Sequence, residues 1–318
     1  MANLGFKIDG RPAEDVVPLA RSAEQSGFDE LWVCEDLALA GGMVQVAAAL
    51  TATSRIEVGL GIAPAAVRNA MYLAMEFAAA ARLSAGRFHA GIGHGMPQWL
   101  TQVGSHPASL MTCLREVAET VRALLEGNDV SYSGQHVQLD AVSLTHPPAV
   151  VPPLSLGVRG PKGIELARQL GLGVILAEGS PPEYVAEVRR ILGPTARITV
   201  FVWSNLDPGS QRGLEALRPT VREALHKSHL SAQLGALHGS PTCELDLVQR
   251  LAVAGDVQSC RDAIDRLAAS GADSIVLQPI HGAEEQQIDA FAHAGLLSGQ
   301  HTPKAHHPAA RRHAAEVR

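Results

Sequence analysis

The chain has 318 residues, of which 46% are hydrophobic and 18% charged, a composition that can bury a full core and excludes a disordered protein. Its 26 lysines and arginines stand against 32 aspartates and glutamates, and the net charge of −6 argues against nucleic acid or an anionic membrane as a partner. The four cysteines are far apart, with no C-x-x-C pair, and no apolar run is long enough to cross a membrane. We therefore expect a cytoplasmic protein with neither a disulfide framework nor a metal site.

Short apolar runs alternate with longer stretches of helical period, a pattern typical of βα units around a parallel sheet. In chain order, strands are predicted at residues 4–8, 30–34, 56–62, 87–92, 154–158, 173–177, 198–203 and 274–278. Amphipathic helices are predicted between them at residues 12–26, 70–83, 108–125, 161–170, 182–192 and 257–270. Eight parallel strands predict an α/β fold, a closed (β/α)8 TIM barrel.

Two insertions and a tail are predicted around this barrel. Polar and apolar residues alternate over residues 130–139 around Ser133-Gly134, which predicts a small hairpin after the fourth unit. Residues 206–251 are more than a barrel needs and predict extra helices over one mouth. We expect residues 1–298 to form a single domain. Residues 299–318 carry four of the fourteen histidines, and a flexible tail is favoured there over a metal-binding tract.

The residues that follow each strand are the candidates for chemistry, because the active sites of β/α barrels lie at the C-terminal ends of the strands. The informative ends carry Lys7 and Asp9, Cys34-Glu35-Asp36, Gly61-Ile62, Gly93-His94-Gly95, Gly157-Val158-Arg159 and Glu178-Gly179. The glycine-rich fourth end would let a flat ligand approach bare backbone.

The fifth end leads into a predicted helix with Pro161 at its first position. Open backbone N–H groups at Gly160, the helix dipole, and the charge of Lys162 or Arg159 together indicate a phosphate site. A tight turn that needs glycine for its dihedral angles is the alternative interpretation.

Three blocks of sequence together resemble one family. They are Ser54–Ile62, then Leu83–Phe88 leading into Gly91–Gly95, and Gly160–Lys162 before an apolar helix and Gly173–Leu176. In order and spacing they resemble the bacterial luciferase-like superfamily, and within it the branch that uses the deazaflavin coenzyme F420. The resemblance runs from about Gly5 to Pro279, and it implies a β/α barrel, often homodimeric, that binds F420 or a flavin over the strand ends.

The resemblance also implies roles for single positions. Gly61-Ile62 matches a bulge with a cis non-proline peptide that backs the coenzyme ring. Gly93-His94-Gly95 matches the segment beside the ring and its ribityl chain, and Gly160-Pro161-Lys162 matches the phosphate turn. With these we group Gly157, Val158, Arg159 and Glu178 as cofactor-binding candidates.

The chain departs from the family after the second strand, where members commonly carry Asp-His and this chain has Glu35-Asp36. Glu35 is the first candidate for proton transfer, His94 the second and Asp36 the third. Trp99 and Cys34 are candidates for the substrate pocket, with core packing as the alternative for each.

The cofactor decides between two reactions on this scaffold, since a deazaflavin transfers hydride whereas a reduced flavin activates oxygen. We expect an F420-dependent oxidoreductase acting on a small organic substrate. An FMN-dependent luciferase-like monooxygenase is the alternative, and a non-catalytic flavin-binding protein is a third reading. The carboxylates at the strand ends argue against simple binding, because unpaired charge in an apolar mouth is costly.

Overall fold

The computed structural model describes residues 2–210, 212–225 and 230–297. Within these ranges eight parallel strands close into a barrel, in the order β1, β2, β3, β4, β7, β8, β9 and β11, with β11 returning to β1. Their bounds are β1 (Asn3–Ile8), β2 (Glu30–Val33), β3 (Glu57–Pro64), β4 (Phe88–Gly93), β7 (Leu154–Gly157), β8 (Gly173–Leu176), β9 (Ile198–Leu206) and β11 (Ser274–Pro279). The predicted TIM barrel and all eight predicted strands are confirmed.

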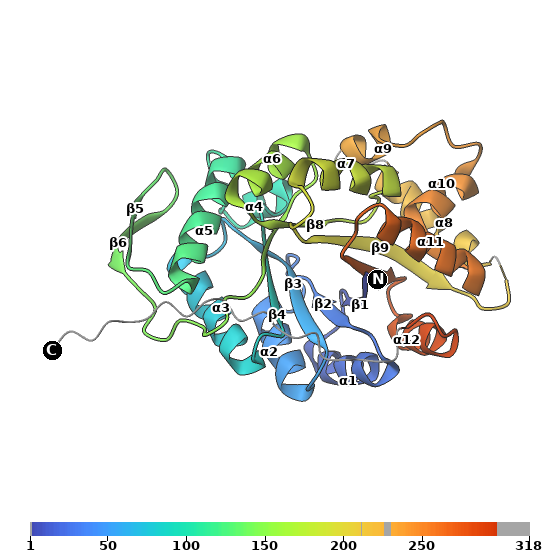
Figure 1. Ribbon diagram of the computed structural model, residues 1–318, viewed down its shortest axis with the longest axis horizontal. Coiled ribbons are helices and arrows are strands. Elements are labelled where there is room, and N and C mark those ends of the chain that lie inside the picture. The colour runs from blue at the N-terminus through green and yellow to red at the C-terminus, as the bar shows by residue number, and fades with distance from the viewer. Residues whose placement is uncertain (1, 211, 226–229, 298–318) are drawn as a thin grey trace.

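Helices surround this barrel, with α6 and α7 on one side and α1, α2 and α3 on the other (Figure 1). Their bounds are η1 (Ala13–Asp15), α1 (Val16–Ser26), α2 (Gly42–Ala52), α3 (Ala70–Ser84), α4 (Pro97–Gln102), α5 (Leu110–Leu125), α6 (Pro161–Leu170), α7 (Pro182–Leu192), α11 (Val257–Ala269) and α12 (Glu284–His293). Residues four apart on a helix face the same side, so Leu73 and Phe77 of α3 are both buried, and Phe77 packs edge-on against Phe88 of β4 at 5.5 Å.

The predicted hairpin is present as β5 (Val130–Ser133) and β6 (Gln138–Val142), and it lies outside the ring of helices (Figure 1). Glu116 of α5 holds its turn, because this carboxylate accepts the backbone N–H groups of Gln135, His136 and Val137 at 2.7–2.9 Å. Burial alone would raise the pKa of Glu116, but these three bonds lower it.

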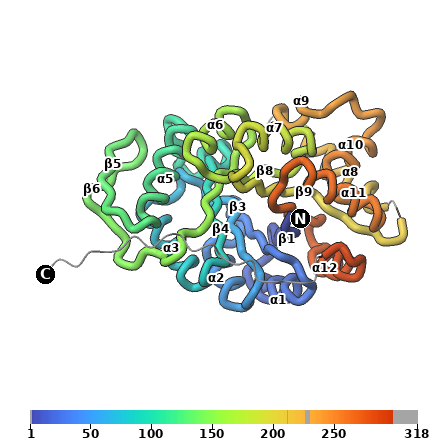
Figure 2. The backbone as a smooth tube through the Cα atoms, viewed as in Figure 1, coloured from blue at the N-terminus to red at the C-terminus, as the bar shows by residue number. Residues whose placement is uncertain are grey.

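The predicted extra helices are α8 (Arg212–Leu225), α9 (Ser231–Gly235) and α10 (Glu244–Leu251), which lie together at one side of the barrel (Figure 2). Leu230, just before α9, packs with Trp203 of β9 and near Gly179 after β8, so this insertion reaches the C-terminal mouth as expected. A short strand that the sequence did not predict, β10 (Ala252–Gly255), pairs with the end of β9. The tail at 299–318 and the domain limit at residue 298 lie outside the described residues.

Glycines in the strands make room for two aromatic rings inside the barrel. A Cβ on Gly59 would lie 2.3 Å from Trp32, and one on Gly61 would lie 2.5 Å from Phe201. The two rings meet edge to face at 5.4 Å between centroids. They fill the middle of the barrel, so a ligand cannot pass through it.

A polar cluster closes the N-terminal end below these rings. Its centre is Glu30, which is fully buried and accepts hydrogen bonds from Asn3, Trp32 and Ser274 at 2.6–2.8 Å. Arg197 pairs with the same carboxylate. Burial alone would raise the pKa of Glu30, but the Arg197 charge and these bonds lower it. Glu30 is therefore fully engaged in structural contacts at this end of the barrel.

Candidate active site

A buried lysine lies at the centre of the C-terminal mouth. Near the end of β1, the Lys7 ammonium donates to Glu178 Oε1 and to Gln278 Oε1, each at 2.8 Å. It also lies 3.3 Å from Asp9 Oδ2 and 5.1 Å from the centroid of the Phe201 ring. Three strands, β1, β8 and β11, thus bring their ends together around one positive charge.

The charges of Lys7 and Glu178 stabilise each other. Burial alone would lower the pKa of Lys7, but the negative charges of Glu178 and Asp9 outweigh it and hold that pKa well above its usual value. Burial alone would raise the pKa of Glu178, and the Lys7 charge and hydrogen bond bring it below the usual value. Both groups are therefore ionised at neutral pH.

Asp36 differs from Glu178, although it faces the same charges. Burial raises the pKa of Asp36, the Lys7 charge lowers it in part, and the charges of Asp9 and Glu178 raise it further. Arg159 contributes a second, largely buried positive charge near Asp36 and Glu178, and burial lowers the pKa of this guanidinium. The structure thus brings three predicted residues, Asp36, Arg159 and Glu178, into one cluster, in which Asp36 is the carboxyl best suited to carry a proton.

Glu35, the first candidate for proton transfer, lies in a separate ion pair. Its two carboxylate oxygens accept from Arg68 Nη1 at 2.6 Å and Nη2 at 2.5 Å, and Oε1 also accepts the Gly42 N–H at 3.2 Å. Arg68 in turn lies 3.1 Å from Glu76. Proton transfer by Glu35 would require this two-bond pair to open, so the arrangement favours Asp36 over Glu35.

The peptide bond between Gly61 and Ile62 is cis, as the resemblance implies. The glycines of the neighbouring strand ends seat the Ile62 side chain, since a Cβ on Gly93 or Gly157 would lie 2.8 Å or 2.6 Å from it. Gly93 and Gly157, which were predicted to contact the cofactor, therefore also have a packing role.

Of the remaining mouth candidates, Cys34 lies close enough to Lys7 for an electrostatic interaction, whereas in the described residues no contact joins His94 or Trp99 to Lys7 and its partners. His94 Nδ1 lies 2.7 Å from the carbonyl oxygen of Gly95, and Trp99 is half-buried on α4. The buried Cys34 thiol donates to the carbonyl of Gly61 at 2.9 Å, and burial raises the pKa of that thiol. Cys34 packs in the barrel core with Trp32, as the packing alternative for this residue expects.

The predicted phosphate turn has an open end. Pro161 is the first residue of α6, and the preceding Gly160 provides no side-chain cap for the helix N–H groups. A Cβ on Gly160 would have no heavy atom within 4 Å, whereas one on Gly163 would lie 2.6 Å from the buried Val158. Val158 and Gly163 thus hold α6 against β7, and Gly160 and the exposed Lys162 face open space.

A cavity of about 260 Å³ adjoins the cluster. Side chains of the first, second and last barrel strand ends line it, namely Lys7, Asp9, Asp36, Leu39, Gln278, Pro279, His281 and Glu284. Lys7 was named only among the informative strand ends, without a role, and Gln278 was not predicted. A lysine within the apolar run 4–8 was the available signal, because lysine is rarely buried without a partner.

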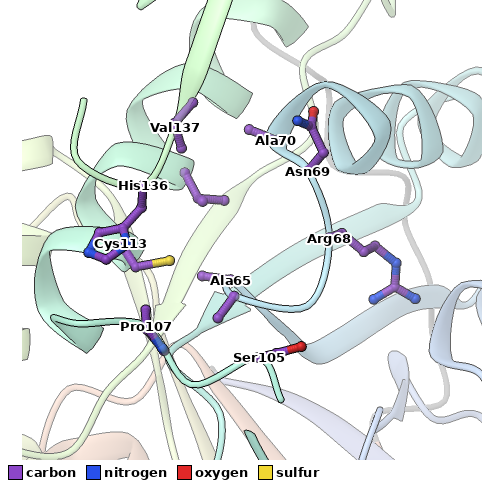
Figure 3. A pocket seen from close by; sticks show the side chains of 11 residues that line it. Ala65, Arg68, Asn69, Ala70, Ser105, Pro107, Cys113, His136 and Val137 are labelled. Carbon is purple, nitrogen blue, oxygen red and sulfur yellow. The ribbon is translucent and has the colours of Figure 1, made fainter. Parts of the chain in front are cut away.

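A second, smaller cavity of about 140 Å³ is lined by Arg68, the partner of Glu35 (Figure 3). Arg68 stands on the opposite side of it from His136 and Cys113. The hairpin turn supplies His136, so the insertion reaches the surroundings of the mouth. In the part of the chain that the structure describes, no group of three or more His, Cys, Asp or Glu residues is arranged to hold a metal ion.

Residues 4–198, well over half of the chain, match the family model described as luciferase-like monooxygenase. The chain belongs to this family. One relative, 5,10-methylenetetrahydromethanopterin reductase of Methanopyrus kandleri, is 22% identical over 91% of this chain and 97% of its own length. The 5,10-methylenetetrahydromethanopterin reductase of Archaeoglobus fulgidus is 24% identical over 80% of this chain and 86% of its own length.

Solved structures show the same fold. An F420-dependent secondary alcohol dehydrogenase with an F420–acetone adduct superposes with a TM-score of 0.77, at 22% identity over 92% of this chain and 98% of its own. A monooxygenase of Streptomyces bottropensis superposes with a TM-score of 0.75, at 22% identity and the same two coverages. Among the described residues, no helix is long and apolar enough to span a bilayer.

Proposed function

We propose that this luciferase-like protein is an F420-dependent oxidoreductase that transfers hydride between the deazaflavin and a small organic substrate. The observation that carries the proposal is the end-to-end similarity to the reductase of Methanopyrus kandleri, which spans 91% of this chain and 97% of the relative. An F420-dependent alcohol dehydrogenase has the same fold over 92% of the chain.

The residues at the mouth fit such a cofactor. The open N-terminus of α6, with Gly160, Lys162 and the buried Arg159, suits a phosphate. The ends of β3 and β4, with Ile62 and His94, would lie beside the ring. When bound, F420 would accept or donate a hydride.

Asp36 is the residue we assign to proton transfer. Hydride addition to a carbonyl or imine carbon places negative charge on the neighbouring atom, and a proton must follow. The pKa of Asp36 is raised, which favours its protonated form beside the 260 Å³ cavity. Lys7 and Glu178 then act as positioning residues, because their ion pair fixes the charges that set this pKa.

An FMN-dependent monooxygenase is the second candidate, and the superposition on the monooxygenase of Streptomyces bottropensis favours it. FMN also carries a phosphate that would suit the end of α6. Non-catalytic flavin binding is the third candidate function. The mouth itself offers no residue that excludes the flavin.

Equilibrium titration with F420 and with FMN tests the proposal. We expect F420 to bind at least about tenfold more tightly, and Gly160→Val to weaken binding strongly because the new side chain would occupy the open space before α6. Anaerobic oxidation of reduced F420 by a panel of ketones and imines then tests hydride transfer. Tighter binding of FMN, with oxygen consumed during turnover, would support the monooxygenase instead.

We also propose that the enzyme is a cytoplasmic homodimer. The outer face of α3 exposes Tyr72, Met75 and Leu83, and neighbouring α2 exposes Val44, which is 70% accessible. Clustered apolar side chains of this kind are typical of surfaces that associate. A reducing compartment agrees with Cys34, Cys113, Cys243 and Cys260, which are all free thiols.

A further inference from the structure

A groove between α5 and α6 lies next to the mouth but outside it. Its volume is about 350 Å³, within the range of pockets that hold small ligands. Arg115 and Thr112 of α5 line one wall, and Lys162, Glu165 and Gln169 of α6 line the other. None of these side chains takes part in the Lys7 cluster.

The groove carries net positive charge. Among the described residues the exposed Lys162 side chain has no ion pair or hydrogen bond. Arg115 donates to the neutral Gln169 at 2.7 Å, and its distance to Glu119 is 3.7 Å. The one carboxylate in the wall, Glu165, is neutralised by two hydrogen bonds from Arg168 at 2.7 and 2.8 Å.

The position of Lys162 connects the groove with the open end of α6. Lys162 is the second residue of that helix, directly after Pro161 and the open Gly160. A ligand whose phosphate lies at this end, and whose chain continues beyond the phosphate, would pass Lys162 and enter the groove. FMN ends at its phosphate, whereas F420 continues from its phosphodiester into a chain of linked glutamates.

We propose that the groove between α5 and α6 binds the acidic oligoglutamate tail of F420, with Lys162 and Arg115 as its cationic contacts. This assignment rests on the proposed function, since it requires F420 as the cofactor. It gives the chain a reason to prefer F420 over FMN that lies outside the ring-binding mouth.

The test compares two forms of the cofactor, F420 with several glutamates and F420 without any, by fluorescence titration of the wild-type protein. We expect the tailed form to bind about fivefold to tenfold more tightly at low salt, and this advantage to shrink as ionic strength rises, because exposed charges are screened. Arg115→Ala should remove most of the advantage and leave the affinity for the tail-less form unchanged. Arg115→Glu should reverse the preference.

Arg190→Ala is the matched control, because it removes one exposed cation from α7, outside the groove. It should keep the full tail-dependent advantage. Equal affinities of the wild type for the two forms, or an advantage that survives Arg115→Glu, would overturn the tail site while the F420 function stands. Failure of both forms to bind, with FMN binding normally, would overturn the proposed function and the tail site together.

Discussion

At the scale of single residues, the carboxyl groups of the mouth differ in how readily they hold a proton. Lys7 and Arg159 contribute two positive charges, and Asp9 and Glu178 contribute two negative ones. Asp36 is the fifth group, and burial together with the two carboxylates raises its pKa. The cluster therefore favours a protonated Asp36.

Replacing Asp36 with Asn should slow the chemical step at least about a hundredfold, which is the usual contribution of a general acid. Glu35→Gln is the comparison, since Glu35 is held by Arg68. Single-turnover oxidation of reduced F420 would measure both variants. If Glu35→Gln caused the loss and Asp36→Asn did not, the assignment of the proton donor would be reversed.

The same Asp36→Asn variant has a stability signature that needs no substrate. A carboxyl whose pKa is raised in the folded state takes up more protons there, so the wild type loses stability as pH rises from about 3.9 through the raised pKa. Asparagine does not titrate, so the variant does not lose stability in this way as the pH rises. The melting temperature of the variant, measured across pH, should exceed that of the wild type near neutral pH and lose this difference in acid.

Lys7→Met should destabilise the fold by about 3 kcal/mol, because it leaves Glu178 as a buried charge without its partner. The double variant Lys7→Met/Glu178→Gln should recover most of that loss. Urea unfolding of the two variants and the wild type gives the comparison. A double variant no more stable than Lys7→Met would show that the ion pair is not the source of the effect.

At the scale of elements, the glycines of the strands decide which side chains fill the barrel. Gly59 accommodates Trp32, Gly61 accommodates Phe201, and Gly93 and Gly157 accommodate Ile62. The mouth is thus built on a floor of closely packed apolar groups. Rigid support of this kind holds polar groups such as Lys7 in fixed positions.

Gly59→Ala should cost about 3 kcal/mol of stability, because its Cβ would lie 2.3 Å from the fully buried Trp32 ring. Gly209→Ala is the matched control, since a Cβ there meets no atom within 4 Å. Thermal and urea unfolding should separate the two variants clearly. Equal stabilities would mean that the barrel interior relaxes around the added methyl group.

At the scale of the whole molecule, the exposed apolar side chains of α3, Tyr72, Met75 and Leu83, form the surface that we propose for the dimer. Tyr72→Glu combined with Met75→Glu should convert the proposed dimer into a monomer of 33.5 kDa, because charge would be buried in the contact. Light scattering after gel filtration measures the mass. Ala186→Glu, at an exposed position of α7 on the other side of the barrel from α3 (Figure 1), should leave the dimer intact. A wild-type mass of one chain would contradict the proposal.

The sequence alone was enough to predict the barrel. Strands, helices, the hairpin and the start of α6 at Pro161 depend on local period, turn residues and helix caps, which neighbouring residues determine. The same pattern also predicted where each strand ends. Hence Glu178, Asp36 and Arg159 could be named as site candidates before any contact was known. The short strand β10 and the helices α2, α4 and α12 were not predicted.

Only the tertiary structure decided which of these residues act together. Lys7 meets Glu178 and Gln278, 171 and 271 positions away, because closure of the barrel brings the ends of β1, β8 and β11 together. Beyond the end of β2, Glu35 pairs with Arg68, whereas its neighbour Asp36 faces the charges of Lys7, Asp9 and Glu178. Such pairings depend on strand register and barrel closure, which no local pattern encodes, and they move the predicted proton donor from Glu35 to its neighbour.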